Sequence, residues 1–152
     1  MSANIKIFLG ADHGGYELKN KISEHLVHHG FDVEDCGAKT LDPQDDYPQY
    51  AYQVATKVLG EEEGAAAGIL VCRSGQGVAM AANRVHGIRA AVVWSQELAR
   101  ETRSDNHANV LCLPSDFIDL DTALTIVDDF LAEKYSHEAR HVRRVKQLEE
   151  LS

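Results

Sequence analysis

The chain has 152 residues, 44% of them hydrophobic and 26% charged, which suits one soluble globular domain with a sizeable core. A formal net charge of −9 argues against non-specific binding to nucleic acid, and no apolar run approaches the roughly 20 residues that a membrane-spanning helix needs. The three cysteines do not suggest a disulfide framework, and the first residues lack the layout of a signal peptide. We therefore expect reduced thiols and a cytoplasmic protein.

Strand-like and helix-like segments alternate along the chain. The predicted strands are residues 5–9, 31–35, 68–72, 88–94 and 110–113. The predicted helices are residues 15–29, 48–60, 78–83, 95–103 and 122–135. Near-continuously apolar strands that alternate with helices predict a parallel sheet covered on both faces, within a single domain over residues 1–152.

The final segment, residues 136–152, does not fit that alternation. Val142, Val145, Leu148 and Leu151 recur every three residues and give a terminal helix an apolar stripe. No strand follows that would return this helix to the sheet. The stripe either covers its own domain or, as we expect, packs against a second copy of the chain.

The same segment is basic although the chain as a whole is acidic. Its cationic and histidine side chains between residues 137 and 146 are His137, Arg140, His141, Arg143, Arg144 and Lys146. Such a run is usually a solvated helix face. The alternative is a binding surface for a phosphorylated ligand.

The carboxyl ends of parallel strands meet at one edge of a sheet, and ligands bind in the loops there. We expect the site at that edge, in the loops 10–15, 73–77 and 104–109. The polar loop 36–47 is unusually long for a connection in an α/β protein, which also suggests a function.

The strongest candidate for chemistry is Cys72, which ends a predicted strand and precedes a glycine-rich turn. The turn and the helix that follows both favour the thiolate form. The turn residues Ser74, Gly75, Gln76 and Gly77 can form a cradle in which backbone N–H groups converge on an anion. The alternative is a tight strand-to-helix turn with no ligand.

The other two cysteines carry weaker signals. Cys112 lies within a predicted strand and is interpreted as an inert core residue, and Cys36 is a loop thiol without an assigned task.

Two further candidates precede predicted helices. His13, next to Asp12 in the first loop, could donate to a phosphate at the start of the following helix, or it could be an exposed loop histidine. Tyr47 could close over a polar ligand, or it could belong only to the entry of its helix.

The loop 104–109 holds Asp105, Asn106 and His107. His107 could act as an acid or a base near neutral pH. A solvated turn, for which asparagine is a natural residue, explains this segment equally well.

Taken together, these motifs resemble those of the type B ribose-5-phosphate isomerases and the related galactose-6-phosphate isomerases. The matching segments, in family order, are GADHGG (10–15), DYPQYA (46–51), ILVCRSGQGV (69–78), AANR (81–84), GIRA (87–90), NVL (109–111) and RHVRRV (140–145). The resemblance implies a Rossmann-like three-layer α/β/α sandwich with a five-stranded parallel sheet. It also implies a homodimer or a dimer of dimers with active sites shared between subunits.

The resemblance further implies isomerisation of an aldose phosphate to a ketose phosphate without metal or cofactor, with ribose 5-phosphate to ribulose 5-phosphate as the first expectation. Cys72 matches the base that moves a proton between C2 and C1, and Ser74 matches a residue that helps to shuttle the hydroxyl proton. The segment from Arg73 to Gly77 matches the loop that stabilises the enediolate. The remaining positions expected to bind substrate are Asp12, His13, Tyr47, Arg140 and Arg144, the two arginines reaching the phosphate from the partner subunit.

The chain departs from the family pattern at three positions. Asp105 stands where a histidine often assists opening of the furanose ring, Arg73 stands at a usual glycine, and Gln76 replaces a typically apolar residue. Either His107 or His13 performs ring opening, or that step differs. Asp105 and Asn106 are retained as expected binding residues.

These departures leave the substrate open. A four-carbon aldose phosphate cannot close a furanose ring and needs no ring-opening histidine, so it is an alternative substrate, as is a six-carbon sugar phosphate. A non-catalytic sugar-phosphate sensor would keep His13, Arg140 and Arg144 but would not need Cys72. Binding of NAD is weaker still, because residues 10–15 lack the G-x-G-x-x-G spacing.

Overall fold

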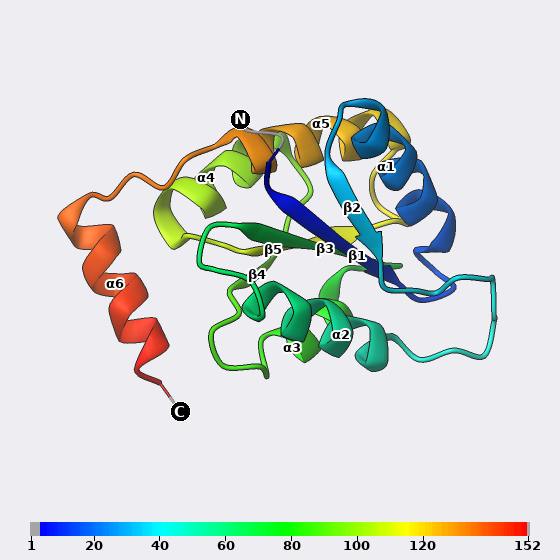
Figure 1. Ribbon diagram of the computed structural model, residues 1–152, viewed down its shortest axis with the longest axis horizontal. Helices are drawn as coiled ribbons and strands as arrows, with labels where there is room; N and C mark the ends of the chain where they lie inside the picture. Colours follow the sequence, from blue (N-terminus) through cyan, green and yellow to red (C-terminus); the bar gives the residue numbers. More distant parts are fainter. Residues whose placement is uncertain (1–3, 152) are drawn as a thin grey trace.

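The structure, a computed structural model, describes residues 4–151 and is built around a parallel five-stranded sheet (Figure 1). Its strands are β1 (Lys6–Ala11), β2 (Asp32–Asp35), β3 (Ala66–Cys72), β4 (Ala90–Val92) and β5 (Val110–Pro114), in the spatial order β2-β1-β3-β5-β4. The helices are α1 (Tyr16–His28), α2 (Tyr47–Leu59), α3 (Gln76–Ala82), α4 (Gln96–Asn106), α5 (Leu120–Ala132) and α6 (Ala139–Glu149). The predicted α/β/α sandwich is confirmed.

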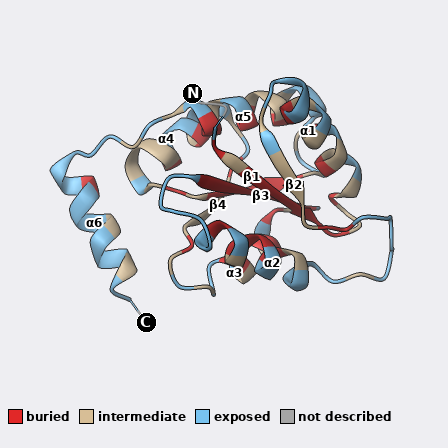
Figure 2. Ribbon diagram, viewed as in Figure 1, coloured by how far each residue is buried: buried red, intermediate tan, exposed pale blue. Residues whose placement is uncertain are grey.

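The helices form two layers, with α1, α4 and α5 on one face of the sheet and α2 and α3 on the other (Figure 1). Successive strand residues point to opposite faces. In β3, Ile69 and Val71 therefore face α1 and α5, whereas Leu70 and Cys72 face α2 and α3. Both faces of the central strands β1, β3 and β5 are buried, as Figure 2 shows, which explains why these strands are almost entirely apolar, whereas the edge strand β2 (Asp32–Asp35) is polar and partly exposed.

Most predicted boundaries differ from the observed ones by one to three residues, and two of these differences are instructive. β4 has three residues instead of the seven in 88–94, and side chains supply the hydrogen bonds at its start: the amide of Arg89 donates to Asn109 Oδ1 and that of Ala90, its first residue, to Asn83 Oδ1. α4 continues past residue 103 to Asn106 and ends at His107, whose φ of 54° is left-handed.

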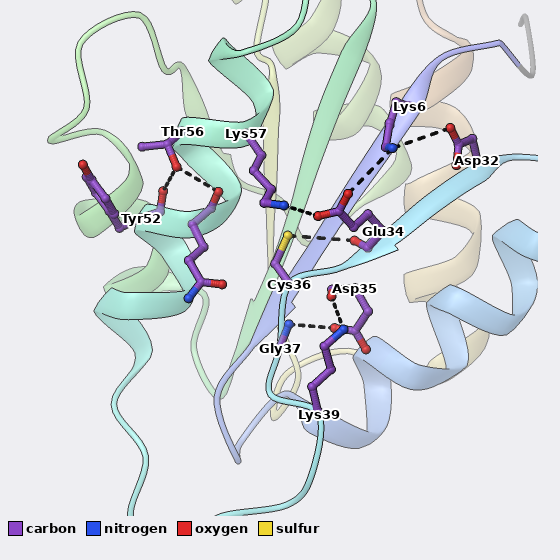
Figure 3. Close-up of polar contacts among 11 residues, drawn as sticks. Lys6, Asp32, Glu34, Asp35, Cys36, Gly37, Lys39, Tyr52, Thr56 and Lys57 are labelled. Atoms are coloured by element: carbon purple, nitrogen blue, oxygen red, sulfur yellow. Dashed lines mark hydrogen bonds and ion pairs between the residues drawn. The ribbon is translucent and has the colours of Figure 1, made fainter.

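The long connection between β2 and α2 is anchored by a buried lysine. Lys19 on α1 is 1% exposed, and its Nζ lies 2.8 Å and 2.9 Å from the two carboxylate oxygens of Asp35 and 2.6 Å from the carbonyl of Ala38. The Gly37 amide also donates to Asp35 (Figure 3). These contacts fix the start of the connection against α1.

α6 projects from the rest of the structure (Figures 1 and 2). It contacts α4, and its Glu149 pairs with Arg89 at 2.7 Å. Its stripe remains open to solvent: Val142, Leu148 and Leu151 are 43%, 49% and 67% exposed. Among residues 4–151, no helix has the length and apolarity to cross a membrane.

Candidate active site

Cys72 ends β3 and is 5% exposed, among the side chains packed between the sheet and α2 and α3. Cys112 on the adjacent strand is fully buried. Burial raises the pKa of the Cys112 thiol, and the nearby Cys72 raises it further. Cys112 is thus the core thiol that the sequence predicts, and Cys72 is the thiol at a strand end.

Cys36 lies directly after β2, beside Lys57 and Glu34 (Figure 3), and packs at the margin of the cluster that contains Cys72 and Cys112. Burial raises the pKa of its half-buried thiol, and the negative charge of Glu34 acts in the same direction. Both effects disfavour the thiolate, so Cys36 provides a natural comparison for Cys72.

The glycine-rich turn after Cys72 has the backbone that the cradle requires. Gly75 has a φ of 74°, in the left-handed region that glycine adopts without strain, and precedes the first residue of α3. The amide of Gln76 donates to Ser74 Oγ at 3.3 Å. The Tyr47 ring lies so close to Gly77 that a Cβ there would be 2.6 Å from it, so Tyr47 packs on the last residue of the cradle.

The loop after β1 packs against the end of β3. A Cβ on Gly15 would lie 2.4 Å from the carbonyl oxygen of Val71, so only glycine fits there. Asp12 is 8% exposed, and its Oδ1 accepts a hydrogen bond from the Gly15 amide at 3.2 Å, which holds the turn into α1. The two loops predicted to carry the thiol and the phosphate-binding histidine are therefore neighbours.

Residues after β5, which the sequence analysis did not identify, tie these loops together. The Ser115 hydroxyl donates to the Gly14 carbonyl at 2.7 Å, and the Ser115 amide donates to the Cys72 carbonyl at 3.0 Å. These residues could have been found from the sequence, because they directly follow a predicted strand, as the loops 10–15 and 73–77 do.

Arg73 lies across this junction. A Cβ on Gly14 would be 2.5 Å from Arg73 Cγ, so the stem of Arg73 covers that glycine. Its guanidinium pairs with Asp116 at 3.6 Å, and both side chains remain largely in solvent. Arg73 therefore places a cation between the loops after β1 and β5.

His13 is held by a residue that the sequence analysis missed. The Asp45 Oδ1 accepts hydrogen bonds from the His13 amide at 2.9 Å and from the ring Nδ1 at 2.8 Å, and Oδ2 accepts one from the Tyr50 hydroxyl at 3.0 Å. Only the unusual length of the loop 36–47 signalled that it has a role.

The prediction that loop 104–109 lies at the carboxyl edge is wrong. This segment precedes β5, and in a parallel sheet a segment that precedes a strand lies at the amino edge. Gly68 pairs with Val110 at that end of β3, whereas Cys72 pairs with Pro114 at the other. Four strand residues, about 13 Å, separate the two ends. Asp105, Asn106 and His107 are thus not brought to the Cys72 of the same chain.

His107 instead lines a cavity of about 460 Å³ at the amino edge, together with Arg89 and Arg103. Its ring stacks on Tyr135 with centroids 4.1 Å apart, and its carbonyl accepts a hydrogen bond from Arg89 Nε at 2.7 Å. Burial lowers the pKa of His107, and the neighbouring arginines lower it further. The structure therefore favours a neutral imidazole at this position.

The arginines of α6 are also away from Cys72 within one chain. Arg140 and Arg144 are exposed, and Arg140 Nε pairs with Glu138 at 3.2 Å. The neighbouring His141 is buried, with Nδ1 3.6 Å from Asp105 Oδ1. Asp105 therefore lies at the contact between α4 and α6.

The family described as Ribose/Galactose Isomerase matches residues 7–148. The chain belongs to this family. It is 43% identical over 145 residues to the probable ribose-5-phosphate isomerase B of Mycoplasma genitalium, covering 95% of this chain and 94% of the relative. It is 42% identical over 141 residues to ribose-5-phosphate isomerase B of Escherichia coli K12, covering 93% and 92%.

Solved structures of this family have the same fold. The Mycoplasma genitalium ribose-5-phosphate isomerase B, with ribulose-5-phosphate bound, superposes with a TM-score of 0.91 at 43% identity over 95% of this chain and 94% of that one. The Thermotoga maritima enzyme gives a TM-score of 0.91 at 40% identity over 97% and 99%. The resemblance drawn from the sequence motifs is confirmed.

In this chain, the expected site residues fall into two groups by their position in the fold. Asp12, His13, Tyr47 and the segment from Cys72 to Gly77 meet at the carboxyl edge. Asp105, Asn106, His107, Arg140 and Arg144 belong to the amino edge and to α6. Across residues 4–151, no group of three or more His, Cys, Asp or Glu side chains is arranged to hold a metal ion.

Proposed function

We propose that this chain interconverts ribose 5-phosphate and ribulose 5-phosphate, with Cys72 as the base. The observation that carries the proposal is the Cys72 thiol at the end of β3, three residues before the left-handed Gly75, with the Tyr47 ring against Gly77 of the same turn. Family membership supports it, since the relatives are named ribose-5-phosphate isomerase B and one of them binds ribulose-5-phosphate.

The reaction follows from the positions of these groups. The Cys72 thiolate removes the proton from C2 of the open-chain aldose, the C2 electron pair forms the C1–C2 double bond, and the carbonyl pair moves to O1. Backbone N–H groups of the turn stabilise this enediolate oxygen. The Ser74 hydroxyl relays the proton from O2 to O1, and Cys72 returns its proton to C1, which leaves the ketone at C2.

A second copy of the chain completes the site in this proposal. His13 binds the phosphate from the carboxyl edge, and Arg140 and Arg144 of the partner subunit approach it from α6. The exposed stripe and exposed arginines of α6 support this arrangement, because both are accessible to a second copy of the chain. The assembly is a homodimer or a dimer of dimers, and the cytoplasm is the proposed location, which suits three cysteines that are all free.

Steady-state isomerisation of ribose 5-phosphate by the native chain, Cys72→Ala and Cys36→Ala tests the proposal. We expect rapid turnover by the native chain, a loss of at least about 100-fold in kcat for Cys72→Ala, and no change for Cys36→Ala. Substantial activity in Cys72→Ala would refute the assigned base. A folded native chain that binds ribose 5-phosphate without turnover would favour the sensor, and turnover of erythrose 4-phosphate alone would favour the four-carbon substrate.

A further inference from the structure

The side chain of Asp45 is buried although the residue lies in a long polar loop. Its side chain is 3% exposed, and it reaches His13, which is 32 positions away in the sequence. Both of its oxygens are used: Oδ1 accepts hydrogen bonds from the amide and from the ring Nδ1 of His13, and Oδ2 accepts one from the hydroxyl of Tyr50. A loop anchor needs only the bond to the backbone amide, so the bond to the ring requires a separate explanation.

The protonation states of the three groups follow from their contacts. Burial alone would raise the pKa of Asp45, but the hydrogen bonds from His13 and Tyr50 outweigh it and leave that pKa below its usual value. Burial raises the pKa of Tyr50, and the bond to Asp45 raises it further, so Tyr50 stays a donor. Asp45 is therefore a carboxylate at neutral pH and can only accept.

Because Asp45 accepts, the nitrogen of His13 that faces it must carry a proton. The ring is then fixed with Nδ1–H on Asp45, and Nε2 is the nitrogen left for a ligand. His13 lies in the loop that leads into α1, a helix of 13 residues whose amino end favours anions. A proton added to this ring goes to Nε2, where it can be donated to an anion while Asp45 balances the charge.

We propose that Asp45 is a positioning residue that holds His13 in one orientation and one tautomer, with Nε2 directed to the phosphate of the substrate. This inference rests on the proposed function, since it takes a sugar phosphate as the ligand. Asp45 does not touch the substrate and acts through His13. Tyr50, on the first turn of α2, fixes the second oxygen of Asp45 and so belongs to the same chain of contacts.

A double-mutant cycle tests this role. We expect Asp45→Ala to raise the KM for ribose 5-phosphate and the Kd for inorganic phosphate about tenfold, with little change in kcat, because a misplaced His13 weakens binding of the phosphate in every state. In a His13→Ala background the same substitution should add less than about twofold, since its effect passes through the ring. Equal losses in both backgrounds would mean that Asp45 only supports the loop, and would overturn the proposal.

Asp45→Asn is the conservative variant. The amide oxygen can still accept from both N–H groups of His13, so we expect it to retain most of the phosphate affinity. Losses as large as those of Asp45→Ala would contradict positioning by these hydrogen bonds.

The ¹⁵N chemical shifts of the His13 ring are measured on the native chain, so this test does not depend on whether a variant folds. We expect the proton on Nδ1 in the neutral ring, and a neutral ring with its proton on Nε2 would overturn the proposal. The phosphate titrations and the ring shifts do not depend on turnover. A failure of the proposed isomerase activity is therefore distinguishable from a failure of Asp45 to position His13.

Discussion

The two edges of the sheet differ in how completely a single chain builds them. At the carboxyl edge the loops are fastened to one another, by Ser115 on Gly14 and by Asp45 on His13. At the amino edge α6 projects into solvent (Figure 2), and its Val142 and Leu148 are 43% and 49% exposed. One edge is closed by contacts within the chain, and the other has an open surface.

This difference follows from the topology. Short loops that leave adjacent parallel strands lie side by side and can bind one another, whereas the amino edge receives the chain as it returns from the helices. The proposed thiol, cradle and histidine therefore need only one chain. Under the proposed function, Arg140 and Arg144 bind the phosphate only in the site that contains the Cys72 of another copy. The amino edge and α6 of one subunit therefore complete the site at the carboxyl edge of its partner.

Mixing two inactive variants tests whether the two edges of one site come from different subunits, and it should give the largest effect. Cys72→Ala should lose the base, and the double variant Arg140→Ala, Arg144→Ala should lose phosphate contacts, each lowering kcat/KM on the order of 100-fold. If the two edges of a site come from different subunits, co-refolding equal amounts should restore about a quarter of native activity, because half of the dimers then carry one intact site.

The control is the triple variant that carries all three substitutions on one chain, co-refolded with Cys72→Ala. No mixed dimer from this pair has an intact site, so we expect no recovery. If the first mixture is no more active than the two variants measured separately and added, Arg140 and Arg144 do not contribute to the site of a partner subunit.

Lys19→Met is expected to destabilise the loops at the carboxyl edge without changing the amino edge. The substitution removes the donor for the Ala38 carbonyl and the main partner of Asp35, so the loop that carries Asp45 loses its anchor. Since Asp35 is itself partly exposed, we expect the free energy of unfolding to fall by about 2–3 kcal/mol, below the range for a fully buried pair. Urea denaturation with an unchanged slope measures this loss.

Lys57→Met is the matched control, because the ion pair of Lys57 with Glu34 lies on the surface (Figure 3). Its removal should leave the urea midpoint nearly unchanged, since exposed pairs are screened by solvent. Equal shifts in the two variants would argue that Lys19 is not an anchor.

The closed edge could be predicted from the sequence because local patterns determine it. Strand 68–72 is continuously apolar, and Cys72 and the glycine-rich turn follow it directly, so the position of the thiol needs no knowledge of distant residues. The loop 104–109 was placed wrongly because it was treated like the loops that follow strands, although it precedes one. The direction of the chain, applied to Asp105 and His107, was enough to place them at the amino edge.

The contact of Asp45 with His13 could not be predicted in the same way. It depends on how an irregular loop folds back over 32 positions, and no periodicity constrains that path. The exposure of the α6 stripe is a different case. Its apolar spacing predicted a helix and an interface, but only the structure shows that α4 and Arg89 leave Leu148 and Leu151 uncovered.

Arg73→Gly tests the size of the pocket at the closed edge. The stem of Arg73 covers Gly14 and its head pairs with Asp116, so its removal opens space beside the cradle. We expect kcat/KM for ribose 5-phosphate to rise about tenfold relative to that for erythrose 4-phosphate, a change of the size that one polar or apolar pocket contact provides. An unchanged ratio would show that Arg73 does not limit substrate length. Arg84→Gly, an exposed arginine outside the carboxyl edge, is the control.

The smallest effect concerns His107 at the open edge. Burial lowers the pKa of its imidazole, Arg89 and Arg103 lower it further, and Glu63 opposes them. His137 and the ring of Tyr135 also face it. Because the folded-state pKa lies below that of the unfolded chain, the unfolded state binds the proton more readily, and His107 costs stability as the pH falls through about 6.5 toward the folded value.

His107→Asn removes this titration and keeps a residue that tolerates a positive φ. Stability of the variant, from urea midpoints at pH 7 and pH 5.5, should fall less on acidification than that of the native chain, by under about 1 kcal/mol. The exposed His86→Asn should leave the native pH dependence in place. A pH dependence in His107→Asn as steep as in the native chain would show that the imidazole is not held neutral by its surroundings. The open edge would then already accept the proton in a single chain, and its cavity would not disfavour a charge.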